Sequence, residues 1–457
     1  MATRFSTQES REPTPASPIG ATPLHKRRFG ADLAYQRGFG NEFESEAVPG
    51  ALPRGNNPQR APLGLYSEQI NTTSFTAGRG RSRLTYVFRL RPSAANGRYV
   101  RRDAGLVRTA PTGLEHVPTQ MRWNAFEIPS KPQNFSEGLT TLCANGDVHL
   151  QTGIAVHVYL ANQSMTDSAF ATNDGELLIL PQLGGISIFT ELGVLDVEPG
   201  ELALIPRGCR FRVELAGDKA RGYVCENYGA PMGLPELGPL GTSGLAKAID
   251  FQAPVAAFED TTGPFQLIQK FSGCLWVCEL EYSPLDVVAW RGSSTPYKFN
   301  MDNFIAMGSV SRDHPDPSIF TALTSLSHPV LGANVDLLIL PPRWFVGDDT
   351  FRPAPFHRNA GTEFSAVIYG AHESKSSGTY PGGAVLHNAF VPHGPDVAIF
   401  EKGSTSGAAP HKIEGSLMFA LETRFPLRTT EFALNAPELQ HDYPNVWQGF
   451  TKSFPRM

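Results

Sequence analysis

The residues best able to do chemistry lie near the end of the chain, where four of its twelve histidines fall in one short segment. His357 and Glu363 are six residues apart in this segment, and so are His387 and His393. On a β-strand, side chains an even number of residues apart share a face, and the neighbouring residues are strand formers. Two imidazoles and one carboxylate on one face form a ligand set that non-haem Fe(II) oxygenases use. Any single histidine is better explained as an ordinary core or surface residue, but the matched spacing favours a metal site.

The same segment resembles the two sequence motifs of the cupin family. The first motif places a glutamate and then a glycine after a His-X-His triplet, and its counterparts here are His357, Asn359, Glu363 and Gly370. The second motif places a histidine after Pro-X-Gly, and it is approximated by Pro381, Gly382, Gly383 and His387. Asn359 stands in the place of the second histidine of the triplet, and strand parity predicts that it faces the pocket.

The first half of the chain carries a degenerate copy of the second motif. Gly200, Pro206 and Gly208 match its turn residues, and Phe211 stands where a ligand histidine would be. A phenylalanine offers no lone pair to a metal. We therefore expect two cupin-like halves, of which the second holds the metal and the first has a structural role.

Short strand-like runs separated by glycine and proline dominate the sequence from about residue 84. This pattern, with almost no helical periodicity, predicts an all-β protein of the cupin or jelly-roll type, made of two β-rich halves with few helices. The expected strands include residues 303–310 and 396–401. Helical turns are expected within 435–450.

The composition of the chain suggests its division into domains. Residues 1–34 are rich in Ser, Thr, Pro and Arg and predict a disordered tail. An N-terminal β-sandwich domain is expected over 35–290, and its first part, 35–66, is an irregular strap dense in Gly, Pro and Asn. The C-terminal cupin domain that carries the metal is expected over 291–457.

Charge and cysteine content exclude several classes of partner. The 39 Lys plus Arg against 44 Asp plus Glu give a net charge of −5, which argues against nucleic-acid binding. No apolar run approaches the ~18 residues of a membrane span, so no membrane association is expected. Five cysteines in a long chain are typical of a reducing compartment, and the N-terminal segment lacks the apolar centre of a secretory signal. We therefore expect a cytoplasmic protein.

From about residue 35 to 450, the chain resembles the homogentisate 1,2-dioxygenase family. The strings that carry the resemblance occur in order and include RGFGNEFESE, LPRGNNPQ, VVAWRGSSTPYKFN, SRDHPDPSIF, FHRN, PGGAVLH and PHGPD. The resemblance implies an Fe(II) enzyme that opens the ring of 2,5-dihydroxyphenylacetate with dioxygen, giving maleylacetoacetate in tyrosine and phenylalanine breakdown. It also implies a small aromatic acid and dioxygen as partners, and a homohexamer built as a dimer of trimers.

Carried over residue by residue, the resemblance implies roles for individual side chains. His357, Glu363 and His393 match the metal ligands, although spacing alone slightly favours His387 over His393 as the third ligand. His314, within RDHPDPS, matches the residue that takes the proton of the substrate hydroxyl; without the resemblance it would be interpreted as a loop histidine. The residues expected against the substrate are Asn359, His372, His387 and His393.

The sequence departs from the family pattern around Glu363. The family's tyrosine that helps to hold the substrate carboxylate is replaced by His372, and Gly361, Thr362 and Ser365 are further departures. A histidine can donate a hydrogen bond or, if protonated, attract a carboxylate. Tyr369 shares strand parity with Glu363 and would refill the space, although a packing role is the better interpretation.

These departures leave two alternatives open. One is a paralogous ring-cleaving dioxygenase for another hydroxylated aromatic acid, which the replacement at His372 motivates. The other is a bicupin that binds or stores a ligand without turnover, against which the intact ligand set and His314 argue. The ligand set also accepts manganese, so the expectation of iron rests on the resemblance.

Overall fold

The computed structural model describes residues 29–30, 33–111, 114–307, 311–328, 332–407, 409–452 and 454. Strands dominate this part of the chain, and its two α-helices are the short α1 (Val397–Thr405) and α2 (Glu431–Asn435). The predicted all-β class with few helices is therefore confirmed. The predicted disordered tail, 1–34, lies outside the described residues apart from 29, 30, 33 and 34. Neither α-helix is long and apolar enough to cross a membrane.

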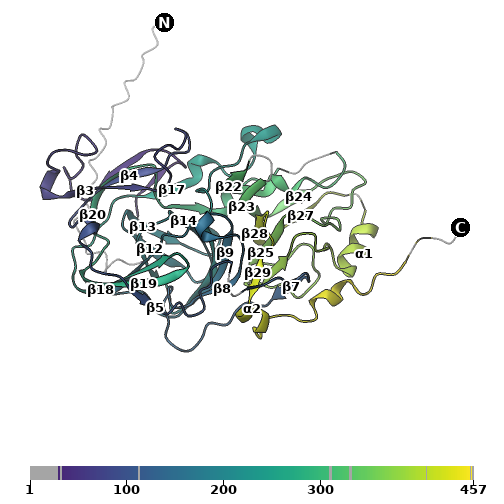
Figure 1. The fold of residues 1–457 in the computed structure, drawn as a ribbon. Helices are drawn as coiled ribbons and strands as arrows, with labels where there is room; N and C mark the ends of the chain where they lie inside the picture. The colour runs from purple at the N-terminus through teal and green to yellow at the C-terminus, as the bar shows by residue number, and fades with distance from the viewer. Residues whose placement is uncertain are drawn as a thin grey trace, which may run out of the picture.

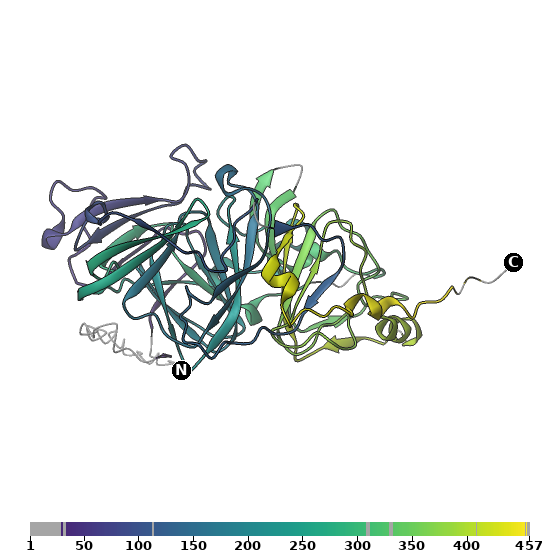
Figure 2. The same ribbon diagram turned by 60° about the horizontal axis from the view of Figure 1, so that its bottom comes forward.

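A ten-stranded sheet forms the middle of the molecule (Figures 1 and 2). Its strands, in spatial order, are β1 (Tyr35–Arg37), β17 (Phe251–Pro254), β21 (Tyr297–Asn300), β14 (Glu201–Ile205), β11 (Glu176–Leu183), β16 (Ala220–Asn227), β9 (Ile154–Ala161), β8 (Leu139–Ala144), β29 (Arg428–Thr430) and β6 (Leu114–Glu115). The long strands β11, β16 and β9 lie at its centre and pair antiparallel.

A seven-stranded sheet covers one face of the ten-stranded sheet and completes the N-terminal sandwich. Its strands, in order, are β13 (Gly193–Val197), β12 (Ile186–Thr190), β15 (Phe211–Leu215), β10 (Ser168–Thr172), β18 (Thr262–Phe271), β19 (Cys274–Tyr282) and β5 (Val100–Arg102). Apolar side chains from the two sheets, among them Tyr159, Ile179, Ile188 and Phe211, form one buried core between them.

A six-stranded sheet from the C-terminal half covers the other face. Its strands, in order, are β22 (Thr321–His328), β23 (Gly332–Leu340), β28 (Leu417–Thr423), β25 (Thr362–Tyr369), β26 (Ala384–His387) and β7 (Met121–Trp123). Tyr223 of the ten-stranded sheet packs edge-on against Phe364 and Phe419, with ring centroids 5.8 and 5.7 Å apart. Because both faces of the ten-stranded sheet are covered, its central strands β9, β11 and β16 are buried along nearly their whole length.

The predicted strap belongs to the edge of the N-terminal half. Its segment supplies β1 and also β2 (Phe43–Glu46), which joins β20 (Val287–Gly292), β4 (Leu84–Arg89) and β3 (Tyr66–Asn71) in a four-stranded sheet. Phe39 anchors the strap, because its ring lies 4.7 Å from that of Phe251 in the core. A further pair, β24 (Arg343–Phe345) and β27 (His411–Ile413), lies beside the C-terminal sheet.

The two β-rich halves exchange strands. β7, from the N-terminal part of the chain, pairs with β26 at the edge of the C-terminal sheet. In return β29, from near the end of the chain, pairs with β8 of the ten-stranded sheet. The division into 35–290 and 291–457 stays a prediction, and neither part holds all the strands of its own sheets.

Two predicted strands are wrong within the described residues. Residues 397–401 form the first part of helix α1, and Asp396 is its N-cap. The Asp396 carboxylate accepts a hydrogen bond from Ile399 N at 2.9 Å. Residues 303–307 hold only the end of a 3₁₀ turn, Met301–Asn303, and an isolated bridge from Ile305 to Leu245. The predicted helical turn near the C-terminus is present as the 3₁₀ helix Tyr443–Trp447.

Phe211 is a core residue of the N-terminal sandwich. It is fully buried, and its ring packs edge-on against Phe170 and Phe135, with centroids 5.7 and 5.9 Å away. The position at which the cupin motif would place a ligand therefore contributes to an aromatic cluster.

Buried charges also occupy this half. The Lys270 ammonium lies 2.7 Å from Asp174 Oδ2 and 2.9 Å from Glu226 Oε2. Although burial opposes it, the neighbouring Lys270 and His157 lower the pKa of Glu226 to about 2. Two carboxylates and an ammonium thus form a buried ionic cluster that depends on Lys270 as its cation.

Replacing Lys270 by Met should destabilise the fold. The change leaves Asp174 and Glu226 buried without their cation, which costs about 3–5 kcal/mol of unfolding free energy. The measurement is the midpoint of urea unfolding followed by tryptophan fluorescence. Lys412→Ala is the matched control, because its partner Glu414 is 69% exposed and such pairs contribute less than about 1 kcal/mol. Equal midpoints for the two variants would contradict the stabilising role of Lys270.

Candidate metal centre

Three segments of the C-terminal half bring the predicted ligands together. Glu363 is the second residue of β25, His357 lies in the segment before that strand, and His393 lies in the loop after β26. His357 and His393 form an antiparallel bridge, with backbone N to O distances of 3.0 and 3.1 Å. The prediction that His357, Asn359 and Glu363 lie on one strand is wrong, because β25 begins only at Thr362. The backbone bridge positions His357 instead.

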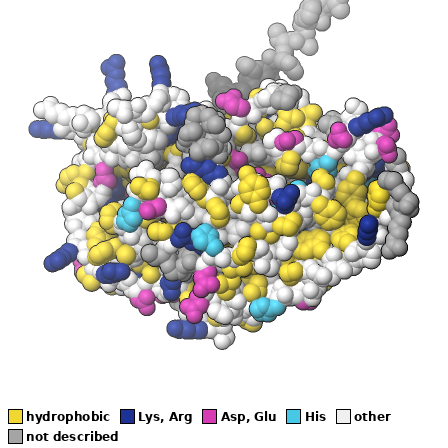
Figure 3. All heavy atoms as spheres, turned by 45° about the vertical axis from the view of Figure 1, so that its right-hand side comes forward, with side chains coloured by type: hydrophobic (Ala, Val, Ile, Leu, Met, Phe, Trp, Pro, Cys, Tyr) yellow, Lys and Arg dark blue, Asp and Glu magenta, His cyan; other side chains and the backbone are white. Residues whose placement is uncertain are grey.

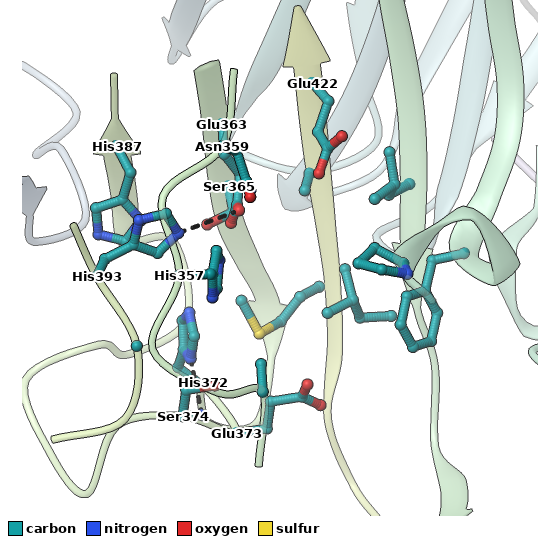
Figure 4. Close-up of a pocket in the computed structure, with 18 of the residues that line it drawn as sticks. His357, Asn359, Glu363, Ser365, His372, Glu373, Ser374, His387, His393 and Glu422 are labelled. Atoms are coloured by element: carbon teal, nitrogen blue, oxygen red, sulfur yellow. Dashed lines mark hydrogen bonds and ion pairs between the residues drawn. The ribbon is translucent and has the colours of Figure 1, made fainter. Parts of the chain in front are cut away.

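The side chains converge as a metal site requires (Figure 4). One ligand atom from each of His357, Glu363 and His393 lies within 4.8 Å of the others, and His393 Nε2 is 3.7 Å from Glu363 Oε2. The Nδ1 atoms of His357 and His393 lie 2.6 and 3.0 Å from the carbonyl oxygens of Pro355 and Val391. These carbonyls accept the Nδ1 protons and leave each Nε2 as a lone-pair donor.

The electrostatics of the three residues suit a cation. Burial lowers the pKa of His357, so its imidazole is neutral near pH 7. Burial alone would raise the pKa of Glu363, but the contacts with His393 and His357 outweigh it and lower the pKa. His393 Nε2 is buried and has no hydrogen-bond partner among the described residues. Two imidazole nitrogens, one of them without a hydrogen-bond partner, and one carboxylate fit a divalent metal ion.

A cavity of about 430 Å³ opens on this triad. Every other residue that the sequence placed near the metal also lines it: His314, Asn359, His372 and His387. His387 lies opposite Glu363 in the β25–β26 ladder. The structure thus brings all the predicted site residues to one cavity.

His314 presents a free nitrogen to this cavity. Its Nδ1 lies 2.9 Å from the carbonyl oxygen of Pro315, while its Nε2 is buried without a partner among the described residues. Burial lowers the pKa of His314. His314 lines the cavity, and a neutral imidazole with a nitrogen free of partners is able to accept a proton.

His372 has a defined protonation state. The Ser374 backbone N–H donates to its Nδ1 at 3.1 Å, which leaves the proton on Nε2. Burial, helped by the Lys375 ammonium, lowers the pKa of His372 to about 3. With this low pKa, His372 is not protonated near pH 7 and does not attract a carboxylate by its charge. The neutral side chain offers an N–H donor.

Tyr369 does not reach the cavity. A register shift between Val367 and Tyr369 breaks the strand parity that related it to Glu363. Its hydroxyl lies 3.2 Å from Asp302 Oδ1, in a separate surface hollow. Tyr369 also packs against the main core cluster, which supports the interpretation as a packing residue.

Four Asp, Glu and Lys residues of the cavity were not predicted from the sequence: Asp316, Glu373, Lys375 and Glu422. Glu422 lies opposite Glu363 on β28, and burial together with the charge of Glu363 raises its pKa to about 7. The parity of Met418, Ala420 and Glu422 on this strand was the signal that could have placed it. Lys375 donates to the Gly394 carbonyl at 2.6 Å, and burial lowers its pKa to about 8. Its surroundings of serine and glycine in the sequence gave no such signal.

The fold and the site define an all-β protein with a candidate metal site of two histidines and one carboxylate. Models of the homogentisate 1,2-dioxygenase N-terminal and C-terminal families match residues 34–301 and 302–454. A homogentisate 1,2-dioxygenase of Rhodopseudomonas palustris (strain BisB18) is 49% identical over 92% of this chain and 94% of its own. One of Pseudomonas savastanoi pv. phaseolicola is 49% identical over 92% of this chain and 97% of its own.

A solved structure of a cupin 2 conserved barrel domain protein from Leptotrichia buccalis is similar at 11% identity. It covers 65% of this chain and 97% of its own, with a TM-score of 0.27.

The chain belongs to the homogentisate 1,2-dioxygenase family. The predicted resemblance is confirmed, and the chain is a ring-cleaving dioxygenase rather than a binding or storage protein. Membership of the family implies a metal cofactor, which agrees with the donor set of His357, Glu363 and His393.

Replacing His357 by Ala should abolish metal binding. Removing one of three ligands leaves too few donors to hold the ion against water, so bound metal should fall from about one per chain to near zero. The measurement is metal content by mass spectrometry after loading with Fe(II) and desalting. His441→Ala is the control, since His441 is exposed and outside the cavity. A full equivalent of metal in H357A would show that the triad is misassigned.

Proposed function

We propose that this enzyme uses Fe(II), held by His357, Glu363 and His393, to open the ring of 2,5-dihydroxyphenylacetate with dioxygen. The observation that carries the proposal is the convergence of these three donors on a cavity that also contains His314 and His372. One carboxylate and two neutral imidazoles leave a divalent ion with a residual positive charge, and open coordination positions would accept the substrate oxygen and dioxygen. The product is maleylacetoacetate.

His314 is the proposed proton acceptor. Its Nε2 is bare and buried beside the cavity, and its lowered pKa keeps it neutral before substrate binds. It would take the proton of a substrate hydroxyl and return it later in the reaction. A hydroxyl close to the metal ion is already a stronger acid than in water, which reduces the barrier to this transfer.

The substrate carboxylate is held by hydrogen-bond donors on the cavity wall. The Nε2–H of His372 is one such donor, because Ser374 fixes its tautomer, and the Asn359 amide is a second. His387, near the metal site, would form a hydrogen bond with the substrate, and His393 would contact the substrate from its place in the ligand set. Burial in the cavity separates the reacting groups from bulk water.

The proposal extends to the cellular setting and to the assembly of several copies. All five cysteines are free, which agrees with a reducing cytoplasm. Apolar side chains gather on the face of the C-terminal half in Figure 3, and the exposed aromatics of this half include Phe356, Phe390 and Phe454. Such a surface supports association of copies. A homohexamer, a dimer of trimers, would have a mass six times 49.7 kDa in solution.

Oxygen uptake by the Fe(II)-loaded protein tests the proposed reaction. Homogentisate should be consumed with dioxygen and give a ring-opened product with its own absorbance, while gentisate and other hydroxylated phenylacetates should react more slowly. Turnover of a neighbouring acid without turnover of homogentisate would favour a paralogous activity, which the replacement at His372 motivates. His372→Tyr distinguishes the two cases: it should preserve activity on homogentisate if His372 and tyrosine serve as equivalent donors.

Replacing His314 by Asn should separate metal binding from turnover. The variant should hold as much iron as the native enzyme, while kcat falls about a hundredfold or more because the proton acceptor is lost. Iron content and steady-state oxygen uptake on the same sample give both quantities. An unchanged kcat in H314N would remove His314 from the reaction.

A further inference from the structure

One histidine of the cavity, His387, has a buried hydrogen-bond partner, Tyr443, that the proposed function does not use. His387 is 3% exposed, and its ring stacks on His393 with centroids 3.9 Å apart and planes at 22°. Its Nε2 lies 3.1 Å from the hydroxyl oxygen of Tyr443. Its Nδ1 is buried and has no partner among the described residues.

Tyr443 reaches this histidine from the C-terminal 3₁₀ helix and is fully buried. Burial raises the pKa of its phenol, so the hydroxyl keeps its proton. The Arg122 guanidinium lies over the ring, 4.2 Å from its centroid. Arg122 is itself fixed, because it donates to Gln440 Oε1 at 2.6 Å and to the Ser377 carbonyl at 3.2 Å. Tyr443 therefore has one orientation, set by a side chain of β7.

Two proton arrangements fit the 3.1 Å contact, and they differ in cost. If His387 Nε2–H donates to Tyr443, the buried phenol proton has no acceptor among the described residues, and Nδ1 is also left without a donor. If the Tyr443 hydroxyl donates to Nε2, its proton is satisfied and the imidazole proton sits on Nδ1. An unsatisfied buried donor costs more than the modest net gain of an ordinary hydrogen bond. The second arrangement leaves one unsatisfied group, Nδ1–H, on a residue that lines the cavity.

We propose that Tyr443 is a positioning residue that fixes His387 as an Nδ1–H donor toward an oxygen atom of the aromatic acid bound in the cavity. The inference rests on the proposed function only for the identity of that acid. The C-terminal segment therefore has a role in substrate binding through Tyr443. Strand β7, from the N-terminal part of the chain, shares this role because its Arg122 packs on Tyr443.

Neutron diffraction from crystals of the iron-loaded enzyme in deuterated buffer tests the tautomer without any substrate. Deuterium should be found on His387 Nδ1 and between Tyr443 Oη and His387 Nε2. Deuterium on Nε2 of His387 would overturn the proposal. This result is independent of whether homogentisate is the substrate, and it needs no variant that could fail to fold.

Tyr443→Phe tests the consequence for binding. Without the hydroxyl, His387 is no longer held in the donor tautomer, so KM for the aromatic acid should rise about tenfold with unchanged iron content and a smaller change in kcat. Tyr159→Phe is the matched control, because Tyr159 is equally buried and its hydroxyl has no partner among the described residues. Unchanged KM in Y443F would contradict the proposal.

A double substitution separates positioning from general stability. Because Tyr443 acts through the histidine, Y443F should have no further effect on KM in a His387→Gln background, in which the amide supplies its own donor. A merely structural role for Tyr443 would raise KM by the same factor in both backgrounds, and that outcome would overturn the proposal. If native enzyme turns over another acid, the same cycle is measured with that acid.

Discussion

Burial of both faces of the ten-stranded sheet is the constraint on which the rest of the structure depends. The seven-stranded sheet covers one face and the six-stranded sheet covers the other, so one layer provides two cores. Hydrophobic burial is favourable in proportion to the apolar area removed from water, and a sheet with two apolar faces is stable only when both are covered. The C-terminal sheet, with the metal centre on its opposite face, is therefore fixed relative to the N-terminal half.

Strand exchange strengthens this arrangement close to the site. β7 extends the C-terminal sheet next to β26, the strand that carries His387. The Trp123 indole N–H on β7 donates to the Ala433 carbonyl at 2.8 Å, and Arg122 beside it packs on Tyr443. The strands beside the cavity, whose own lining lies between His314 and Glu422, are thus supported by chain segments from both ends of the sequence. Rigid support from such neighbours is what keeps site residues in a productive geometry.

The two halves treat buried charge in different ways. In the N-terminal half the Lys270 ammonium neutralises Asp174 and Glu226 within the protein. In the C-terminal half Glu363 converges with two imidazole nitrogens, and among the described residues it forms no ion pair with a lysine or arginine, so its carboxylate is available to a metal ion. Phe211 and His387 occupy the matching position of the second cupin motif in the two halves. Phe211 packs in an aromatic cluster, whereas His387 lines the cavity. The two halves therefore differ in how their buried carboxylates are stabilised.

The sequence by itself determined the chemistry of the site and the class of fold. Imidazole and carboxylate groups bind metal because of their atoms, and period-two runs form strands because alternate side chains share a face. The tertiary structure decided how the residues meet. His357 reaches Glu363 through a backbone bridge to His393 rather than through strand parity, and the bulge before Tyr369 turns that side chain away. The protonation of His372, the helix at Val397–Thr405 and the contact of Tyr443 with His387 all depend on neighbours distant in sequence or on local capping. Local patterns carry no information about such contacts, because burial and hydrogen-bond partners exist only once the sheets have packed.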